Sequence, residues 1–285
     1  MAEARTTEEG DLGRPVATAR MLITGAGGFI GRALRRAAPD ARHADHRALL
    51  EHPGLLDGMA VLIHAGRDPH LGSDRWRLEE DVETRLARLA AARGIRHVML
   101  SSRKVHGLVS APIDAATPVA PCDLYGRQKA AIEAVLGGLV GPGAILLRLS
   151  NIFGCEPGRA SFMGAMLDGL ANRGEIRFDM SPATIRDFLP VDAAAAAILT
   201  VAARAPGGRV TLGSGVPLAT GDFAAALIEG FGAGRLVVTD DRVRDSFLVD
   251  PAGLRAWGVR LPDREAILAR ARDVGAAWRR AQQRR

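Results

Sequence analysis

Short runs of consecutive hydrophobic residues recur along the first half of the chain, and a segment with helical spacing follows most of them. After residues 21–23, Ile30, Ala33, Leu34 and Ala37 repeat every three or four positions. Further runs of this kind lie at residues 60–66, 97–102 and 144–149. Such runs are typical of strands buried on both faces of a sheet. The alternation predicts an α/β fold, a Rossmann-like doubly wound parallel sheet with helices on both faces.

The periodicity also divides the chain. Residues 1–20 are small or polar and lack periodicity, which predicts a disordered N-terminal extension. Residues 21–154 carry the alternation and are expected to form a Rossmann domain. From residue 155 onward, Gly- and Pro-rich turns separate shorter elements. Residues 155–285 are therefore expected to be mainly a smaller substrate-binding lobe, with some segments returning to the Rossmann domain.

The composition limits the class of protein. Of the 285 residues, 47% are hydrophobic, and the net charge of +6 is spread along the chain. A dispersed positive charge suits anionic small ligands and does not indicate nucleic-acid binding. No apolar run reaches the length of a membrane span, and residues 1–20 lack the apolar core of a signal peptide. Cys122 and Cys155 alone cannot form a disulfide framework, so a reducing cytoplasm is the expected compartment.

Three glycines follow the first predicted strand at intervals of three residues: Gly25, Gly28 and Gly31. Between a strand and a helix, the first permits a tight turn and the second lets a pyrophosphate approach the backbone. The third lets the helix pack closely on the strand, and N–H groups of the helix then face the phosphates. We interpret the loop as a dinucleotide site; the alternative is a glycine-rich turn that binds nothing.

The choice between NAD and NADP depends on the end of the second strand, which is expected within residues 41–45. The connection is short enough to lack one strand of the usual fold. An acidic residue about 20 positions beyond the glycine turn binds the adenosine ribose of NAD, whereas a nearby arginine accommodates the 2′-phosphate of NADP. Asp45 is the acidic candidate, and Arg42 and Arg47 flank it. The sequence therefore leaves the cofactor open between NAD and NADP.

Two rare residues on one predicted helix are the main catalytic candidates. Tyr125 is the only tyrosine, and Lys129 is one of only two lysines. Four positions apart on a helix, they share a face, and the ammonium favours the phenolate and thus proton exchange near neutral pH. Ser102, at the end of a predicted strand, is placed to donate a hydrogen bond to the same substrate oxygen. Such a set moves a proton at an alcohol or ketone during hydride transfer with nicotinamide; the alternative is coincidental spacing.

Six segments in order along the chain carry a wider pattern. They are residues 24–31 (TGAGGFIG), 101–107 (SSRKVHG), 125–129 (YGRQK), 150–154 (SNIFG), 186–191 (RDFLPV) and 249–262 (VDPAGLRAWGVRLP). Together they resemble motifs of the extended short-chain dehydrogenases/reductases, in particular the NAD-dependent epimerase/dehydratase family that acts on nucleotide sugars. The similarity runs from about residue 21 to residue 262.

The resemblance implies a nucleotide-sugar substrate and roles for two further residues. Asn151 corresponds to the asparagine that contacts the sugar-nucleotide phosphates, and Arg186 to the arginine that binds the diphosphate. The catalytic set is Ser102, Tyr125 and Lys129, and the substrate-binding set is Ser102, Asn151 and Arg186. The expected cofactor-binding residues are Gly25, Gly28, Phe29, Ile30, Gly31, Asp45, Ala65, Gly66, Tyr125 and Lys129. The family also implies a homodimer formed through helices at residues 74–93 and 125–136.

The chain departs from the family pattern in two places. Arg103 and Lys104 follow Ser102, where the family's 4,6-dehydratases carry two acidic residues that drive water elimination. Basic residues cannot supply a carboxylic acid and a carboxylate, so dehydration is not expected. His106 stands where the family usually has tyrosine, so the contacts with the substrate are expected to differ there.

The expected function is oxidation or reduction of a hydroxyl or keto carbon of a nucleotide-linked sugar. Both a 4-epimerase, which retains its nicotinamide, and a ketoreductase, which exchanges it, agree with the motifs. Two other classes stay open: an NAD(P)H-dependent reductase of a non-nucleotide carbonyl compound, and a non-catalytic dinucleotide-binding scaffold. The histidines at positions 43, 46, 52, 64 and 70 lack the spacing of a ligand set, so no metal is expected.

Overall fold

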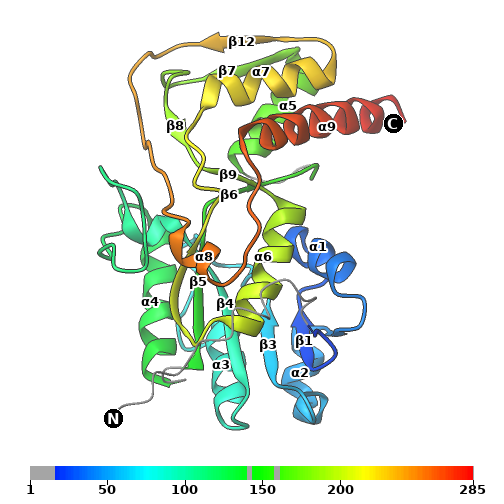
Figure 1. Ribbon diagram of the computed structural model, residues 1–285, viewed down its shortest axis with the longest axis vertical. Coiled ribbons are helices and arrows are strands. Elements are labelled where there is room, and N and C mark those ends of the chain that lie inside the picture. Colours follow the sequence, from blue (N-terminus) through cyan, green and yellow to red (C-terminus); the bar gives the residue numbers. More distant parts are fainter. Residues whose placement is uncertain (1–16, 140–142, 157–160, 285) are drawn as a thin grey trace, which may run out of the picture.

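A parallel sheet forms the centre of the molecule in the computed structural model, which describes residues 17–139, 143–156 and 161–284 (Figure 1). Residues 1–16 of the expected N-terminal extension lie outside this description. The strands, in spatial order, are β2 (Arg42–Ala44), β1 (Met21–Thr24), β3 (Val61–His64), β4 (Arg96–Ser102), β5 (Ile145–Leu149) and β10 (Gly208–Leu212). All neighbouring pairs are parallel, so their carboxyl ends share one edge of the sheet. The predicted Rossmann-like fold is confirmed.

The β2 side of the sheet is narrow. β2 is the edge strand and the only described strand on its side of β1, whereas the common doubly wound order places two strands there. After β2, the short helices α2 (His46–Glu51) and η2 (Pro53–Leu56) return the chain to β3. The short connection therefore lacks one strand, as the sequence predicts.

Helices cover both faces of the sheet because successive strand residues point to opposite sides. The covering helices are α1 (Phe29–Ala37), α3 (Val82–Ala91), α4 (Leu124–Leu139) and α6 (Val191–Arg204). Ile23 and Leu147 belong to the buried cluster that includes α1 and α6. Their sequence neighbours Leu22 and Leu146 face the other way, into clusters that include residues of α3 and α4.

A second hydrophobic core lies beyond the carboxyl edge of the sheet (Figure 1). Its elements are α5 (Phe162–Arg173), α7 (Thr220–Phe231), α9 (Arg264–Gln283) and the strand pairs β6 (Asn151–Phe153) with β9 (Phe188–Pro190), β7 (Glu175–Phe178) with β12 (Arg235–Val238), and β8 (Ile185–Arg186) with β11 (Leu218–Ala219). Phe188 stacks on Phe223 at 4.0 Å between ring centroids, and Phe153 meets Phe223 edge-on. Residues 239–263, which include α8 (Ala252–Ala256), lead from β12 back past the sheet to α9.

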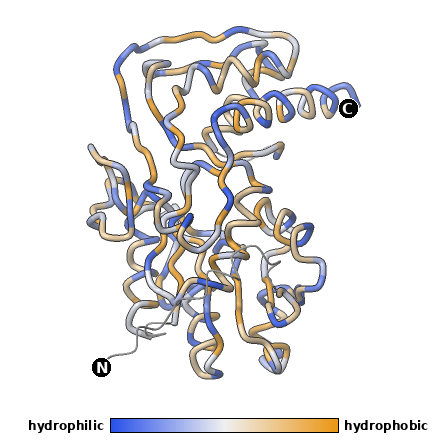
Figure 2. Tube along the Cα trace, in the orientation of Figure 1, coloured by the Kyte–Doolittle hydropathy of each residue, from blue (hydrophilic) through white to orange (hydrophobic). Residues whose placement is uncertain are grey.

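The C-terminal helix α9 closes the second core. Hydrophobic and hydrophilic stretches alternate along it in Figure 2, as expected for a helix buried on one side. The Trp278 indole N–H donates to the carbonyl of Leu167 in α5 at 2.8 Å. Gly275 lets α9 approach α7 closely, since a Cβ atom there would clash with the carbonyl of Leu227. In the described part of the chain, no helix is both long and apolar enough to cross a membrane.

Candidate active site

The glycine turn between β1 and α1 is built from close backbone contacts. Gly25 has a φ of +78°, and a Cβ atom there would clash with the backbone of Ala65 and Gly66. A Cβ atom on Gly31 would clash with the carbonyl of Gly25. A Cβ atom on Gly28 would meet nothing closer than 3.3 Å, so the fold itself leaves more room at this position. Glycines 25 and 31 are therefore required by the turn, and the turn packs directly against the end of β3.

The start of α1 has the charge distribution of an anion-binding helix end. Gly28 caps the helix without a side-chain hydrogen bond, and Phe29 and Ile30 form its first turn, which has no acidic residue. Arg35 and Arg36 lie in the last turn, where they complement the helix dipole. The positive end of the dipole therefore faces the glycine turn without a competing carboxylate in the first turn.

Asp45 lies at the carboxyl end of β2, beside the glycine turn. Its carboxylate caps α2 by accepting a hydrogen bond from the Arg47 N–H at 2.8 Å. This bond lowers the pKa of Asp45, so the carboxylate is ionised at neutral pH. The Arg42 side chain is directed elsewhere and donates to the carbonyl of Leu55. The acidic candidate for ribose binding is thus in place and charged.

A buried histidine supports the glycine turn from the end of β3. His64 Nδ1 lies 2.7 Å from the hydroxyl oxygen of Thr24, and the ring packs against Gly66. Burial lowers the pKa of His64 to about 4, so the ring is neutral at neutral pH. Sequence reasoning considered this histidine only as a metal ligand and missed its place beneath the turn.

Lys129 and Tyr125 share the face of α4 that meets the sheet. Lys129 is only 4% exposed, and its Nζ donates to the carbonyl of Leu100 in β4 at 2.9 Å. Tyr125 lies one turn earlier, half-buried against the hydrophobic cluster that contains Met99. An ammonium group has three N–H donors. The single described hydrogen bond therefore leaves donors for a phenolate or a ribose hydroxyl.

The same face of α4 continues to Glu133, which fixes the helix to the sheet. Arg148 of β5 is fully buried and binds the Glu133 carboxylate through Nε and Nη2, the latter at 2.6 Å. Ser101 donates to the same carboxylate at 2.5 Å. His106 completes the network: Nε2 lies 3.3 Å from Arg148 Nη1, and Nδ1 lies 2.9 Å from the carbonyl of Pro118. Burial lowers the pKa of His106, and both contacts fit a neutral ring with its proton on Nδ1.

Ser102 ends β4 at the shared edge of the sheet. Its Oγ accepts a hydrogen bond from the Lys104 N–H at 3.2 Å, which leaves the hydroxyl proton available for donation. Leu100, which binds Lys129, lies two residues earlier in the same strand. The structure thus gathers the serine and the lysine at the end of β4, with the tyrosine one helical turn from the lysine.

Asn151 and Arg186 both lie beside Phe162. A cavity of about 140 Å³ is lined by Asn151 and Phe162, and the Arg186 guanidinium lies 4.6 Å from the centroid of the Phe162 ring. Asn151 Nδ2 and Arg186 Nε are buried and have no hydrogen-bond partner among the described residues. Buried donors without acceptors are costly. The pair is therefore suited to a ligand that brings oxygen acceptors.

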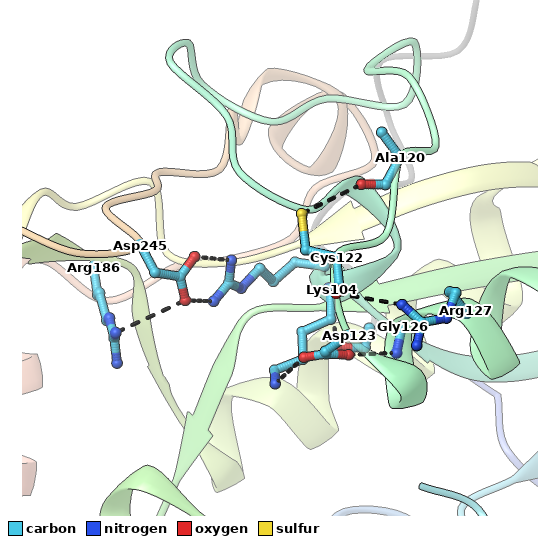
Figure 3. Close-up of polar contacts among 10 residues, drawn as sticks. Lys104, Ala120, Cys122, Asp123, Gly126, Arg127, Arg186 and Asp245 are labelled. Atoms are coloured by element: carbon cyan, nitrogen blue, oxygen red, sulfur yellow. Dashed lines mark hydrogen bonds and ion pairs between the residues drawn. The ribbon is translucent and has the colours of Figure 1, made fainter. Parts of the chain in front are cut away.

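The two basic residues after Ser102 are paired with aspartates that sequence reasoning did not identify. Both terminal nitrogens of Arg103 bind the carboxylate of Asp245, and Lys104 Nζ lies 2.6 Å from Asp123 Oδ2. Asp245 lies between two arginines, with Arg186 Nη2 at 3.8 Å on its other side (Figure 3). Arg103 and Asp245 are separated by 142 positions, so no local pattern in the sequence connects them.

The remaining candidates do not form a further site. Among the described residues, no group of three or more His, Cys, Asp or Glu side chains could hold a metal ion. Cys122, three residues before Tyr125, is exposed, and its Sγ contacts the carbonyl of Ala120 (Figure 3).

Comparison with known proteins agrees with this geometry. A family model described as "NAD dependent epimerase/dehydratase family" matches residues 60–213. One similar structure is a UDP-N-acetylglucosamine 4-epimerase from Methanobrevibacter ruminantium M1 in complex with UDP-N-acetylmuramic acid (18% identity, 92% of this chain and 98% of that chain, TM-score 0.76). Another is a dTDP-glucose 4,6-dehydratase from Bacillus anthracis str. Ames in complex with NAD (16% identity, 93% and 97%, TM-score 0.75). A third is RMD from Pseudomonas aeruginosa complexed with NADPH (20% identity, 92% and 99%, TM-score 0.74). A search of curated proteins gave no match.

Proposed function

Because the chain belongs to the NAD dependent epimerase/dehydratase family, we propose that it transfers a hydride between a nicotinamide dinucleotide and a hydroxyl or keto carbon of a nucleotide-linked sugar. The observation that carries the proposal is the Tyr125–Lys129 pair on α4, with Lys129 buried against the carbonyl of Leu100. Leu100 lies two residues before the carboxyl end of β4. Open α/β sheets bind their ligands at this edge.

The residues at this edge fit a nicotinamide dinucleotide, which supplies or accepts the hydride when bound. The glycine turn presents exposed backbone without side chains at Gly27 and Gly28, and the start of α1 offers a positive dipole for the pyrophosphate. Asp45 would accept hydrogen bonds from the adenosine ribose. In this proposal residues 21–154 hold the dinucleotide, and residues 155–285 hold most of the sugar nucleotide.

Side chains of the protein transfer the proton of the substrate hydroxyl. Tyr125 takes the proton from the substrate hydroxyl during oxidation and returns it during reduction. Lys129 stabilises the phenolate with N–H groups that Leu100 does not use, and Ser102 donates its hydroxyl proton to the same substrate oxygen. Because Glu133 and Arg148 anchor α4 to β5, the phenol and the serine keep a fixed relation.

A diphosphate would satisfy the buried donors on the substrate side. Arg186 offers a planar guanidinium fork and Asn151 an amide donor, and each has a buried nitrogen without a described partner. The M. ruminantium epimerase binds a UDP sugar, which supports a substrate of the same class here. Arg103 and Lys104 are both bound to aspartates and supply no acid for dehydration. The proposed reaction is therefore redox chemistry at one carbon, as in an epimerase or a ketoreductase.

The test begins with the cofactor. The purified protein is gently denatured, and the released small molecules are identified by mass and absorbance. Retained dinucleotide is the result expected of an epimerase, whereas an empty protein that binds added dinucleotide reversibly is the result expected of a ketoreductase. A protein that binds neither NADH nor NADPH would contradict the proposal and favour a non-catalytic scaffold.

The geometry at Asp45 favours NAD over NADP, since a 2′-phosphate would face an ionised carboxylate. We expect wild-type protein to bind NADH more tightly than NADPH in a fluorescence titration. Asp45→Asn should reduce the difference in affinity between NADH and NADPH, because asparagine still caps α2 but carries no charge. An unchanged preference in Asp45→Asn would show that Asp45 does not select the cofactor.

A further inference from the structure

Three charged residues from distant parts of the chain meet in one group, which we call the arginine–aspartate cluster: Arg103, which directly follows Ser102, Asp245 and Arg186. The Arg103 side chain is only 7% exposed, and its two terminal nitrogens bind the two oxygens of Asp245. The Phe247 ring lies 3.8 Å from the Arg103 guanidinium and holds it from one face. Asp245 thus shows that a carboxylate fits this position in the bidentate geometry that arginine prefers.

The cluster has more donors than acceptors. Arg186 Nη2 lies 3.8 Å from Asp245, beyond hydrogen-bond length, and its one hydrogen bond within the described residues is to the sulfur of Met180 at 3.5 Å. Its Nε has no hydrogen-bond partner among the described residues. Asp179 is exposed, and its charge raises the pKa of Arg186 less than the charge of Asp245 does. Two buried guanidinium groups therefore face one carboxylate, and donors remain for a further oxyanion.

Asp245 is held in an unusual backbone conformation, and its side chain is partly exposed. Its φ of 53° is the only positive value among the described non-glycine residues. The next two residues are tied to Ile185: Ser246 Oγ accepts from its N–H at 3.2 Å, and the Phe247 N–H donates to its carbonyl at 3.0 Å. The Asp245 side chain is 31% exposed, so part of its carboxylate already faces solvent. Such local strain is typical of ligand clamps.

We infer, on the basis of the function proposed above, that Asp245 occupies the place of a carboxylate carried by the sugar of the substrate. Arg103 directly follows Ser102, which meets the reacting oxygen in that function, so its guanidinium lies within one side-chain length of the residue that binds the sugar. Arg186 lies on the far side, toward the diphosphate. When the ligand binds, its carboxylate replaces Asp245 on Arg103, and Asp245 turns to solvent. Exchange of one carboxylate for another keeps the buried guanidinium neutralised, which a neutral sugar cannot do.

The test uses the full-length protein and two probes that differ only in the carboxylate, glucuronic acid 1-phosphate and glucose 1-phosphate. Calorimetric titration should show that the acid binds about tenfold more tightly, as expected of a bidentate charged contact. Arg103→Lys, which keeps the charge but not the fork, should remove the preference. Asp245→Asn should tighten binding of the acid because the internal competitor is lost. Asp240→Asn, a change in the same connection at a residue paired with Arg242 and Arg244, should leave both affinities unchanged.

Equal affinity for the two sugar phosphates, or no binding of either, would overturn the inference. Inorganic pyrophosphate tests the other source of an oxyanion. If Arg103→Lys weakens pyrophosphate binding and not the preference for the acid, the cluster serves the diphosphate and the carboxylate assignment is wrong. Equal affinity for the two sugar phosphates, together with Tyr125-dependent hydride transfer from a neutral nucleotide sugar, would overturn this inference and leave the proposed function intact. Absence of dinucleotide binding would overturn the proposed function itself.

Discussion

Lys129 and His64 are both buried near the carboxyl edge of the sheet, and the charge of Lys129 acts on the histidine ring. Burial is the main cause that lowers the pKa of His64 to about 4, and Lys129 is among the charges that lower it further. Lys129 itself is held by the carbonyl of Leu100. A neutral His64 therefore supports the glycine turn without adding a second cation beside the ammonium.

The lowered pKa of His64 predicts acid sensitivity. Between pH ~4 and ~6.5, His64 binds a proton in the unfolded chain but not in the folded chain. The free energy of unfolding therefore falls as the pH drops from about 6.5 to about 4. The full effect of this pKa difference is roughly 3 kcal/mol. His64→Gln should flatten the pH dependence of the unfolding free energy, measured in urea across this range. His52→Gln, at an exposed histidine, is the control, and equal slopes for wild type and His64→Gln would refute the assignment.

Local spacing was sufficient to identify some site residues and not others. Tyr125 and Lys129 are linked by one helical turn, and Ser102 by the end of an apolar run, so the sequence predicts them as a set. Asp245 carries no such signal, because it meets Arg103 only after residues 239–248 pass the end of the sheet. Roles assigned through a single local element could be predicted, whereas contacts between distant loops could not.

Helix α4 connects the candidate chemistry to the sheet through one buried ion pair. Glu133 continues the four-residue spacing of Tyr125 and Lys129, and its carboxylate binds Arg148 in β5. Both side chains are almost completely inaccessible to solvent. Because this pair lies one turn beyond Lys129, it sets the position of α4 against β5, the neighbour of the strand that ends at Ser102. Ser101 and His106 add hydrogen bonds to the same pair.

Replacing only Arg148 should lower the free energy of unfolding more than replacing both residues of the pair. Arg148→Met leaves the buried Glu133 carboxylate without its counter-ion, and we expect a loss of about 3–5 kcal/mol in the free energy of unfolding. The double variant Glu133→Gln, Arg148→Met should be more stable than Arg148→Met, since glutamine is neutral and still accepts from Ser101. Urea unfolding of the single and double variants measures this difference. A double variant less stable than Arg148→Met would contradict the account.

At the level of elements, the sequence predicts most of the central sheet, because β1, β3, β4 and β5 each contain a continuous apolar run, whereas β2 and β10 do not. Arg148 lies within one of these runs, at residues 144–149, and nothing local shows that it is buried and paired. The region beyond residue 155 is harder to predict. Its strands are only two to four residues long apart from β10, and they pair across long separations, as β7 does with β12. Such short elements carry too few residues for a clear period.

The whole molecule consists of a sheet core and a second core, with the candidate site at the edge where they meet. Residues 191–212 return from the second core to supply α6 and β10 of the sheet layer. Arg186 lies just before this return, and its guanidinium stacks on Phe162 of the second core. A ligand that touches both Ser102 and Arg186 therefore bridges the two cores, which matches a sugar joined to a nucleotide diphosphate.

Substitution of Arg186 distinguishes two classes of substrate, a nucleotide sugar with a diphosphate and a carbonyl compound without one. Arg186→Ala should raise KM for a nucleotide sugar by about 10- to 100-fold with a smaller change in kcat, because a charged hydrogen bond contributes roughly 1.5–3 kcal/mol. Arg177→Ala is the matched control, since Arg177 is an exposed arginine of the same lobe. If both variants have the wild-type KM, Arg186 does not bind the diphosphate of the nucleotide sugar, and a carbonyl substrate without a diphosphate is favoured.

The most direct measurement is a single-turnover assay of hydride transfer in wild type and Tyr125→Phe. Each protein is loaded with NAD and mixed with a panel of UDP and dTDP sugars, and reduction is followed by the absorbance of reduced nicotinamide. We predict that wild-type protein reduces NAD with at least one sugar, and that Tyr125→Phe binds NAD equally well but reacts about 100-fold or more slowly. Equal rates in the two proteins would contradict the assignment of Tyr125 as the acid/base and with it the central claim.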